Sequence, residues 1–296
     1  MHHHLQSNGL KCNQAPGDAD VLIARKGVEV STVGPTCVIA EDTDVLVLLI
    51  HHAFCATVPA RCLYFRSDRH NSKHGVWDIG AVCEALGEEL CRTLPFVHAT
   101  AGCDSTSRLF GIGKGLPLKK MKQPSFRTHA EVFCGDEVPS KTSIIQAGEK
   151  SLVCMYGGTD QDDLDRLRVR KFKEKAVTSA SSVKMQSLPP TRDAAKYHPL
   201  RVLYQVRVWK GMDVGRDPLE WGWFEKSNRL WPCMTDSPPA SERILKVVRC
   251  QCKGDCDSKC CSCRRYGFEC NDACTNCKGG GCTNHSVESF EGEDED

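Results

Sequence analysis

The sequence has no long hydrophobic segment. Among its 296 residues the longest unbroken apolar run is Val45–Ile50, whereas a membrane-spanning helix needs about 20 such residues. The opening residues, MHHHLQSNGLKCNQ, lack the apolar core of a secretory signal, and three histidines are too few for a metal-binding tract. We therefore expect an intracellular protein with no membrane partner.

The sequence also lacks an excess of charge of either sign. Lys and Arg number 39 and Asp and Glu number 38, which gives a formal net charge of +1. This net charge indicates no particular partner, but the charge differs between segments. Residues 166–175 are basic, and residues 285–296 form an acidic tail that we expect to be disordered. With 40% hydrophobic residues the chain can bury a core, and its length suggests about two domains.

Cysteine, by contrast, is abundant and unevenly distributed. Ten of the 20 cysteines fall between Cys250 and Cys282. Without a secretory signal, such a block is more typical of zinc binding than of a disulfide scaffold. The ten scattered cysteines are expected to be small buried hydrophobic residues.

Aspartates form a second unusual pattern. Two D-x-D pairs, Asp18/Asp20 and Asp42/Asp44, are followed by a single acid, Asp104. If these carboxylates met they would repel one another unless cations lay between them, and Mg²⁺ or Mn²⁺ suits carboxylate oxygens. Taken singly, each pair is better explained as a helix cap or the end of a strand.

The order of four short motifs shifts that balance. D-A-D, E-D-T-D-V-L, G-C-D-S-T and G-I-G-K occur in this order over residues 16–120. This order resembles the flap-endonuclease branch of the PIN-like nucleases. The resemblance implies an α/β fold, a parallel sheet with helices and a helix-hairpin-helix element. It also implies a divalent-metal-dependent, structure-selective nuclease.

The resemblance assigns roles to individual residues. Asp18, Asp20, Asp42, Asp44 and Asp104 take the places of the Mg²⁺ or Mn²⁺ ligands. Gly111, Gly113 and Lys114 match the segment that holds a duplex phosphate. The family has a further N-terminal segment with more acids, which the sequence begins too late to contain. Two alternatives stay open: a fragment of a longer nuclease, or an inactive PIN-like scaffold that binds DNA or chromatin.

A wider resemblance covers nearly the whole chain. Uncharacterised invertebrate proteins associated with mobile elements share the segments His98–Ser107, Leu188–Thr191 and Asp217–Trp223, together with a C-terminal cysteine block. This resemblance supports the domain architecture and implies little about activity.

The cysteine block is similar to a single tesmin-type CXC module. The resemblance implies about three structural zinc ions with some bridging thiolates, because twelve coordination places would be filled by nine ligands. Cys260 stands outside the pattern, where many such modules have a tyrosine that enters the DNA minor groove. The nine matching residues are Cys250, Cys252, Cys256, Cys261, Cys263, Cys270, Cys274, Cys277 and Cys282.

Basic and aromatic residues lie inside this block. Arg264, Arg265 and Tyr266 fall between Cys263 and Cys270, where they can face DNA phosphates or the minor groove. Alternatively, the bases only offset the negative charge of the thiolates. We expect DNA as the partner, a nuclear location and no small-molecule cofactor.

The expected domains are a partial PIN-like domain at 16–120, a helical extension and linker arm at 121–249, the zinc module at 250–284 and the tail at 285–296. Apolar spacing predicts helices over 76–98, broken near Gly87 or Pro95, and within 194–210, where Pro199 breaks or starts the helix. The acids at 160–165 indicate the start of another helix. His51 and His52 are expected at the surface or in a loop.

Overall fold

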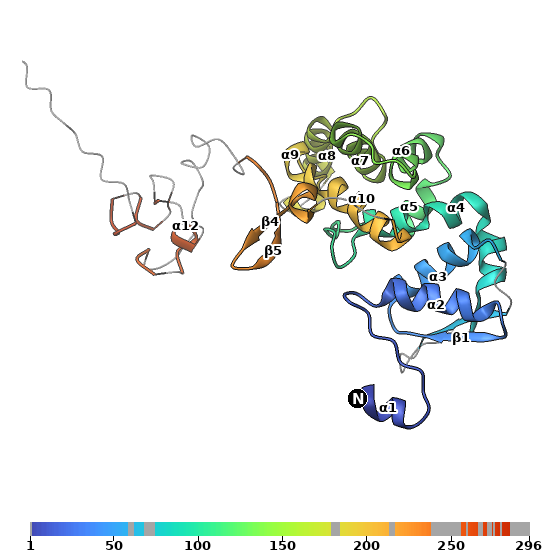
Figure 1. Cartoon of the computed structure of the whole chain (residues 1–296). Coiled ribbons are helices and arrows are strands. Elements are labelled where there is room, and N and C mark those ends of the chain that lie inside the picture. Colours follow the sequence, from blue (N-terminus) through green and yellow to red (C-terminus); the bar gives the residue numbers. More distant parts are fainter. Residues whose placement is uncertain are drawn as a thin grey trace, which may run out of the picture. The chain divides into compact units, whose positions relative to one another are not determined.

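The computed structural model describes residues 2–58, 62–67, 75–178, 184–212 and 217–237, and in the cysteine-rich region 256–258, 260–265, 269–270, 274, 276–278 and 280–284. The chain divides into two compact units, Met1–Thr235 and Asp236–Asp296 (Figure 1). Within the first unit, one hydrophobic core extends from Ala24 to Trp221. The segments 16–120 and 121–249, which we expected as separate regions, therefore share a core as far as the described residues reach.

A small mixed sheet lies in the first half of this unit. Strand β1 (Thr36–Ile39) pairs in parallel with β2 (Leu63–Arg66), with Thr36 opposite Leu63. Strand β3 (Trp77–Asp78) pairs antiparallel with β2. The expected parallel sheet is thus present as the β1–β2 pair, and β3 makes the sheet of the described residues mixed.

Helices α2 (Asp20–Ser31) and α3 (Thr43–Cys55) lie beside this sheet (Figure 1). Gly27 allows the close approach, since a Cβ there would lie 2.7 Å from Cγ2 of Val38 in β1. The β-branched run Val45–Ile50 falls in α3 and is mostly buried. Burial on the core side outweighs the weak local preference of such residues for strands.

Helix α4 (Ile79–Ala101) confirms the predicted break at Gly87, whose φ of 77° and ψ of 167° are not helical. Pro95 lies inside the second half of the helix. Proline has no N–H, so it leaves the carbonyl four residues earlier, that of Cys91, without its helical partner. Nδ1 of His51 lies 3.1 Å from this carbonyl oxygen.

That contact corrects the expected placement of the two histidines. His51 is 4% exposed, and the half-buried His52 places Nε2 2.9 Å from the Trp209 carbonyl oxygen, in the last turn of α10 (Tyr197–Lys210). Carbonyl groups in the last turn of a helix have no partner within the helix. Both histidines therefore satisfy main-chain oxygens inside the fold.

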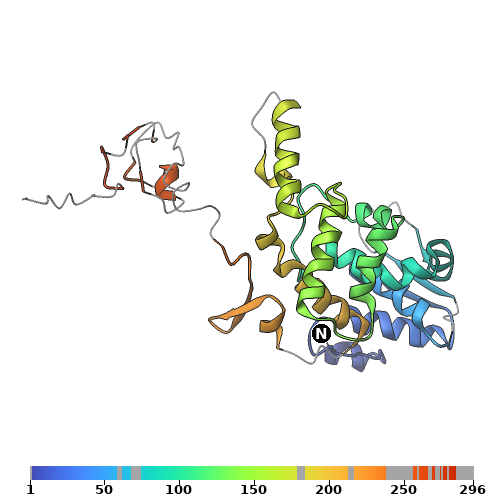
Figure 2. The ribbon, with the colours of Figure 1, turned by 90° about the horizontal axis from the view of Figure 1, so that it is seen from above.

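Further helices complete the first unit, which Figure 2 shows from a second direction. Helix α10 begins two residues before Pro199, so the proline lies in its first turn. Asp163 accepts a hydrogen bond from the N–H of Arg166 at 2.8 Å, which confirms a helix start there. The other helices are α1 (His2–Ser7), α5 (Gly115–Lys120), α6 (Pro124–Cys134), α7 (Lys141–Met155), α8 (Leu164–Thr178) and α9 (Arg192–Ala195), with short 3₁₀ turns η1 (Met185–Ser187) and η2 (Pro218–Trp221).

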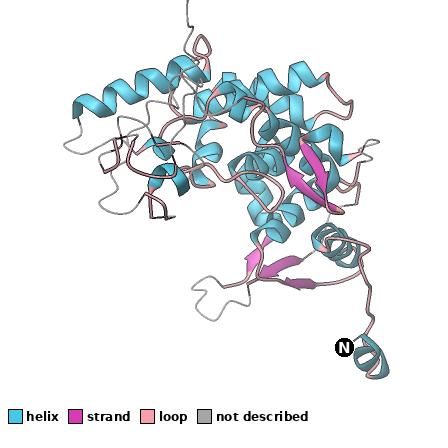
Figure 3. Ribbon diagram, turned by 90° about the vertical axis from the view of Figure 1, so that its left-hand side faces the viewer, coloured by secondary structure: helices cyan, strands magenta, loops and turns pink. Residues whose placement is uncertain are grey.

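The described part of the expected linker arm contains a β-hairpin. Strands β4 (Trp223–Lys226) and β5 (Arg229–Pro232) pair antiparallel, and Figure 3 shows them in magenta as a second sheet. Among the described residues, no helix is long and apolar enough to cross a membrane.

The described part of the second unit is built on cysteine. Its buried cluster holds Cys256, Cys261, Cys263, Cys270, Cys274 and Cys282, with Cys277 packed against it. The one short helix among its described residues is α12 (Ser262–Arg265). The acidic tail at 285–296 lies outside the described residues.

Candidate metal centres

Both D-x-D pairs make the same local hydrogen bond. The N–H of Asp20 donates to Oδ1 of Asp18 at 3.2 Å, and the N–H of Asp44 donates to Oδ1 of Asp42 at 2.9 Å. The second aspartate of each pair lies in the first turn of a helix, but only the second pair supplies the N-cap, because the N-cap of α2 is Ala19. Asp42 is thus the N-cap of α3 and follows the end of β1 by three residues, whereas we expected it at the strand end itself.

A tight turn after α4 presents Asp104. Gly102 has a φ of 109°, and a Cβ there would lie 2.7 Å from Cα of Arg108, so only glycine fits without strain. Thr106 fixes the turn, because its Oγ1 donates to the Ala99 carbonyl at 2.7 Å and accepts from the Cys103 N–H at 3.0 Å. The neighbours of Asp104 in the motif therefore shape the backbone, and the aspartate itself is exposed.

The other four aspartates lie close enough to Asp20 to act on its carboxylate. Burial and the charges of Asp18, Asp42, Asp44 and Asp104 raise the pKa of Asp20 to about 6. Four carboxylates from three separate parts of the sequence thus share one electrostatic neighbourhood with Asp20. Among the described residues, ligand atoms that gather in threes or more within 4.8 Å of one another belong only to cysteines. The acids are therefore neighbours that stay spaced apart.

One side of this acidic cluster is compensated by His98 and Lys114. Nε2 of His98, from α4, lies 2.6 Å from Oδ1 of Asp44 and 2.6 Å from Nζ of Lys114. The Lys114 ammonium lies 3.6 Å from the same Asp44 oxygen. Burial tends to raise the pKa of Asp44, but the hydrogen bonds and charges of His98 and Lys114 outweigh burial and lower it.

The three groups cannot satisfy all of these contacts at once. One ring nitrogen either carries a proton and donates to Asp44, or is unprotonated and accepts from Lys114. The arrangement therefore has two alternative proton placements, and in both Asp44 keeps a cationic or hydrogen-bonding neighbour. Sequence reasoning missed His98 in this role. Its place in α4, six residues before Asp104, was the available signal.

The Gly-Ile-Gly segment forms a turn before α5. Gly111 has a φ of 73°, Ile112 is buried at 8% exposure, and its N–H donates to the Leu109 carbonyl. A Cβ at Gly111 or Gly113 would meet only open space. Lys114, expected to contact phosphate, instead joins this turn to Asp44, and its side chain is 44% exposed.

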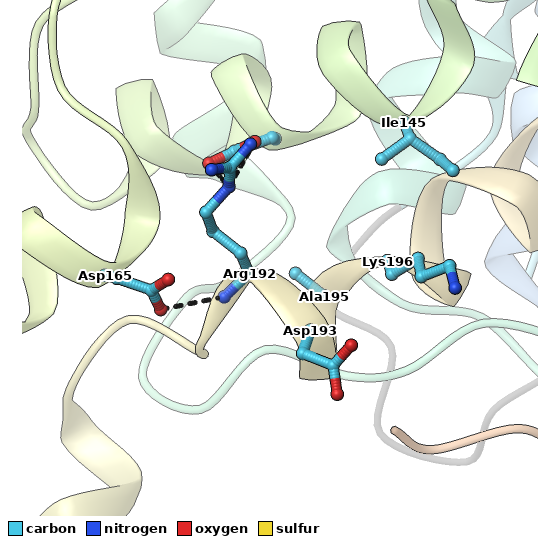
Figure 4. A pocket seen from close by; sticks show the side chains of 7 residues that line it. Ile145, Asp165, Arg192, Asp193, Ala195 and Lys196 are labelled. Carbon is cyan, nitrogen blue, oxygen red and sulfur yellow. Dashed lines mark hydrogen bonds and ion pairs between the residues drawn. The ribbon is translucent and has the colours of Figure 1, made fainter. Parts of the chain in front are cut away.

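A hollow of about 370 Å³ among α7, α8 and α9 contains none of the predicted site residues. Figure 4 shows its lining: Arg192 points to Glu149, with Nε 3.0 Å from Oε1, and the N–H of Arg192 donates to Asp165 at 3.1 Å. These polar groups are already paired with one another. These polar pairs therefore link the helices to one another, and they do not leave unpaired groups in the hollow for a ligand.

In the second unit all seven predicted cysteines within the described residues gather together. Ligand atoms of Cys256, Cys270, Cys277 and Cys282 lie within 4.8 Å of one another, and so do those of Cys261, Cys263 and Cys270. Cys274 lies 3.8 Å from Cys256, sulfur to sulfur. Cys270 belongs to both groups, as a bridging ligand would. Cys260 is exposed and outside them, whereas Cys250 and Cys252 lie outside the described residues.

The sulfur separations fit metal binding. Thiolates about 2.3 Å from one tetrahedral Zn²⁺ are about 3.8 Å apart, and the Cys256–Cys274 and Cys261–Cys270 sulfurs are 3.8 and 3.7 Å apart. A disulfide needs about 2.05 Å. These cysteine clusters can hold metal ions, and a cation is what makes burying so many thiolates favourable.

Side chains around the sulfurs hold the cluster in place. Asn284 donates to Sγ of Cys270 at 3.4 Å, and Asn276 donates to Sγ of Cys256 at 3.5 Å. Such N–H contacts to ligand atoms orient a metal site, and sequence reasoning missed them. Arg264 donates to the Cys256 carbonyl at 3.2 Å and to Oγ1 of Thr283 at 2.7 Å, so it ties the module together. Arg265 is exposed, and Tyr266 lies outside the described residues.

Comparisons of the chain with protein-family models, with curated proteins and with solved structures gave no match.

Proposed function

We propose that the first unit is a PIN-like, nuclease-type domain in which Asp18, Asp20, Asp42, Asp44 and Asp104 bind Mg²⁺ or Mn²⁺ for phosphodiester cleavage. The observation that carries the proposal is the electrostatic link of Asp20 to the other four aspartates. Carboxylates separated by up to 86 positions in sequence repel one another where they gather, which costs stability, and His98 and Lys114 compensate only Asp44. A divalent cation supplies the missing compensation, and its oxygen-rich donor set is present.

When bound, such cations activate a water and stabilise the leaving oxygen of a phosphodiester. The chain's own residues have separate roles. Asp42 caps the helix start that positions Asp44, Asp18 accepts a hydrogen bond from the N–H of Asp20, and the Gly102 turn presents Asp104. Lys114 lies where it can leave Asp44 and contact a phosphate beside the open Gly111–Gly113 turn.

For the second unit we propose a CXC-type module with about three structural zinc ions that tethers the protein to DNA. The support is the sulfur spacing together with the shared position of Cys270. Arg265 is exposed, and we propose it for a phosphate contact. A nuclear location and DNA as partner are parts of this proposal.

A second candidate function is a catalytically inactive nucleic-acid-binding scaffold. The pairing of Asp44 with His98 and Lys114 favours it, because the most buried carboxylate of the five is then compensated without a metal ion. Both candidates share the fold and the partner, and they differ in cleavage.

The test is cleavage of flap, hairpin and single-stranded DNA by the full chain with Mg²⁺ or Mn²⁺. Asp104→Asn and Asp44→Asn test the cluster, and Glu41→Gln is the matched control, since Glu41 is an exposed acid beside Asp42 and the five predicted ligands do not include it. Metal-dependent cleavage lost in both aspartate variants and kept in the control supports the nuclease. DNA binding without cleavage supports the scaffold, and neither activity overturns both.

A further inference from the structure

The β4–β5 hairpin is a locally defined element. Ser227 and Asn228, which connect its strands, have φ values of 55° and 57°. Positive φ at both central residues is the two-residue turn whose twist matches that of a hairpin. The turn fixes the register, so Phe224 lies opposite Trp231 and Lys226 lies opposite Arg229.

The base of the hairpin is fixed to α10. Arg201 donates to the carbonyl oxygens of Gly222 at 2.9 Å and Cys233 at 3.0 Å. Gly222 comes directly before β4 and Cys233 directly after β5. Trp223 packs edge-on against Tyr204 with ring centroids 5.1 Å apart. The hairpin is therefore held by its base to the first unit.

The two faces of the hairpin differ. Side chains alternate along a strand, so Trp223 and Glu225 share one face with Leu230, and the opposite face has two rings and two cations. Phe224 is 44% and Trp231 48% exposed, and Lys226 and Arg229 are exposed as well. We call these four residues the hairpin platform. Within the described part of the chain, none of their side chains has a hydrogen bond, ion pair or ring contact.

We propose that the hairpin platform binds single-stranded nucleic acid, with bases stacked on Phe224 and Trp231 and phosphates at Lys226 and Arg229. Exposed rings give every base an apolar surface without reading sequence, and adjacent cations neutralise the backbone. Glu225 lies on the other face, so the platform itself has only positive charge. The inference extends the proposed nucleic-acid partner to a second site, and it requires neither divalent cations nor cleavage.

The experiment measures binding of fluorescein-labelled dT20 and rU20 to the full chain without added Mg²⁺ or Mn²⁺, with zinc retained. We expect Trp231→Ala and Phe224→Ala each to weaken binding about tenfold. Trp231→Leu should lose as much, because it keeps apolar area but no aromatic ring, whereas Trp231→Tyr should bind nearly as the parent. Leu230→Ala, an exposed change on the other face, is the matched control and should have no effect.

Salt dependence and crosslinking test the geometry. Lys226→Gln and Arg229→Gln should each reduce the slope of log K against log salt by about 0.7. Oligonucleotides with 5-iodouracil should crosslink to Phe224 or Trp231 on irradiation. Comparing dT20 with rU20 distinguishes DNA from RNA.

Three results would overturn the proposal. Trp231→Leu binding as tightly as the parent would show a merely apolar contact. Crosslinks found only elsewhere, for example in the cysteine module, would show that the oligonucleotide binds at another site. Self-association of the parent that Trp231→Ala abolishes, with unchanged oligonucleotide binding, would assign the platform to a second copy of the chain. None of these outcomes depends on cleavage. Failure of the nuclease proposal can therefore be distinguished from failure of the platform proposal.

Discussion

At the residue scale, Asp20 reports the state of the acidic cluster. Its pKa is raised to about 6 in the folded chain from an ordinary 3.8, so above pH 6 its charge opposes folding, and the opposition disappears as pH falls toward 3.8. Asp20→Asn should therefore raise the free energy of unfolding at pH 7.5 by about 1 kcal/mol, after allowance for solvent screening. Urea denaturation without divalent ions measures this. An equal effect of Glu41→Gln would contradict it.

The Lys114 ammonium competes with a divalent ion for Asp44. Replacing its charge in Lys114→Met should tighten Mn²⁺ binding about tenfold, because a cation no longer has to displace an ammonium 3.6 Å from the carboxylate. Lys114→Arg keeps the charge and should bind Mn²⁺ nearly as the parent does. Calorimetric titration with Mn²⁺ checks both variants. Equal affinities in Lys114→Met and the parent would exclude this competition.

Buried histidines should make the fold sensitive to acid. Burial lowers the pKa of His51 and of His198 to about 4, so protonation opposes folding as pH falls from 6.5 to 4. Each histidine should cost up to about 1.4 kcal/mol of stability per pH unit in that window. His198→Gln should make the slope shallower in urea denaturation at several pH values. Asp20 affects the pH dependence of stability in the opposite direction, but equally in the parent and in His198→Gln. An unchanged slope of stability against pH would therefore show that His198 is not a source of the acid sensitivity.

At the scale of elements, helices α7 and α10 meet at Gly148. A Cβ there would lie 2.6 Å from Cγ of Pro199. Gly148→Ala gains about 1 kcal/mol of helix propensity but overpacks a rigid contact, which costs about 1–3 kcal/mol. We therefore expect a net loss of about 1 kcal/mol in thermal or urea unfolding. Gly115→Ala, where the added Cβ meets open space, should not destabilise, and similar losses in the two variants would refute the contact.

Helices α3 and α4 also show why local sequence signals alone did not predict every helix boundary. The break at Gly87 could be predicted from the sequence, because glycine readily adopts a positive φ. Pro95 was an equally good local signal, yet the helix continues through it while His51 contacts the freed Cys91 carbonyl. Val45–Ile50 has strand-like composition, yet Asp42 caps it as a helix. In both cases a distant or capping side chain decided between local alternatives.

At the scale of the whole molecule, the two units have separate cores, one hydrophobic and one of cysteines. Metal removal should therefore unfold the second unit and leave the first intact, because a cysteine core has no cohesion without cations. All five tryptophans lie before residue 236, so their fluorescence reports the first unit. A zinc chelator should release about three zinc ions per chain without changing that fluorescence. Fewer than two zinc ions, or a shifted tryptophan spectrum, would contradict this account.

The sequence by itself indicated the cysteine cluster of the second unit, because spacing along the chain limits which residues can be neighbours. The close cysteine spacing in 250–284 required a shared cluster, and the structure gathers its seven described members. Within each D-x-D pair a hydrogen bond spans only two residues, and in the second pair it caps the start of α3.

Only the tertiary structure decided what surrounds those acids. It brought His98 from α4 and Lys114 from the following turn to Asp44, contacts between residues 54 and 70 positions apart. It also left the hairpin platform without a partner among the described residues. Such contacts depend on how helices and turns pack, and packing is set by the whole core, which no local spacing encodes.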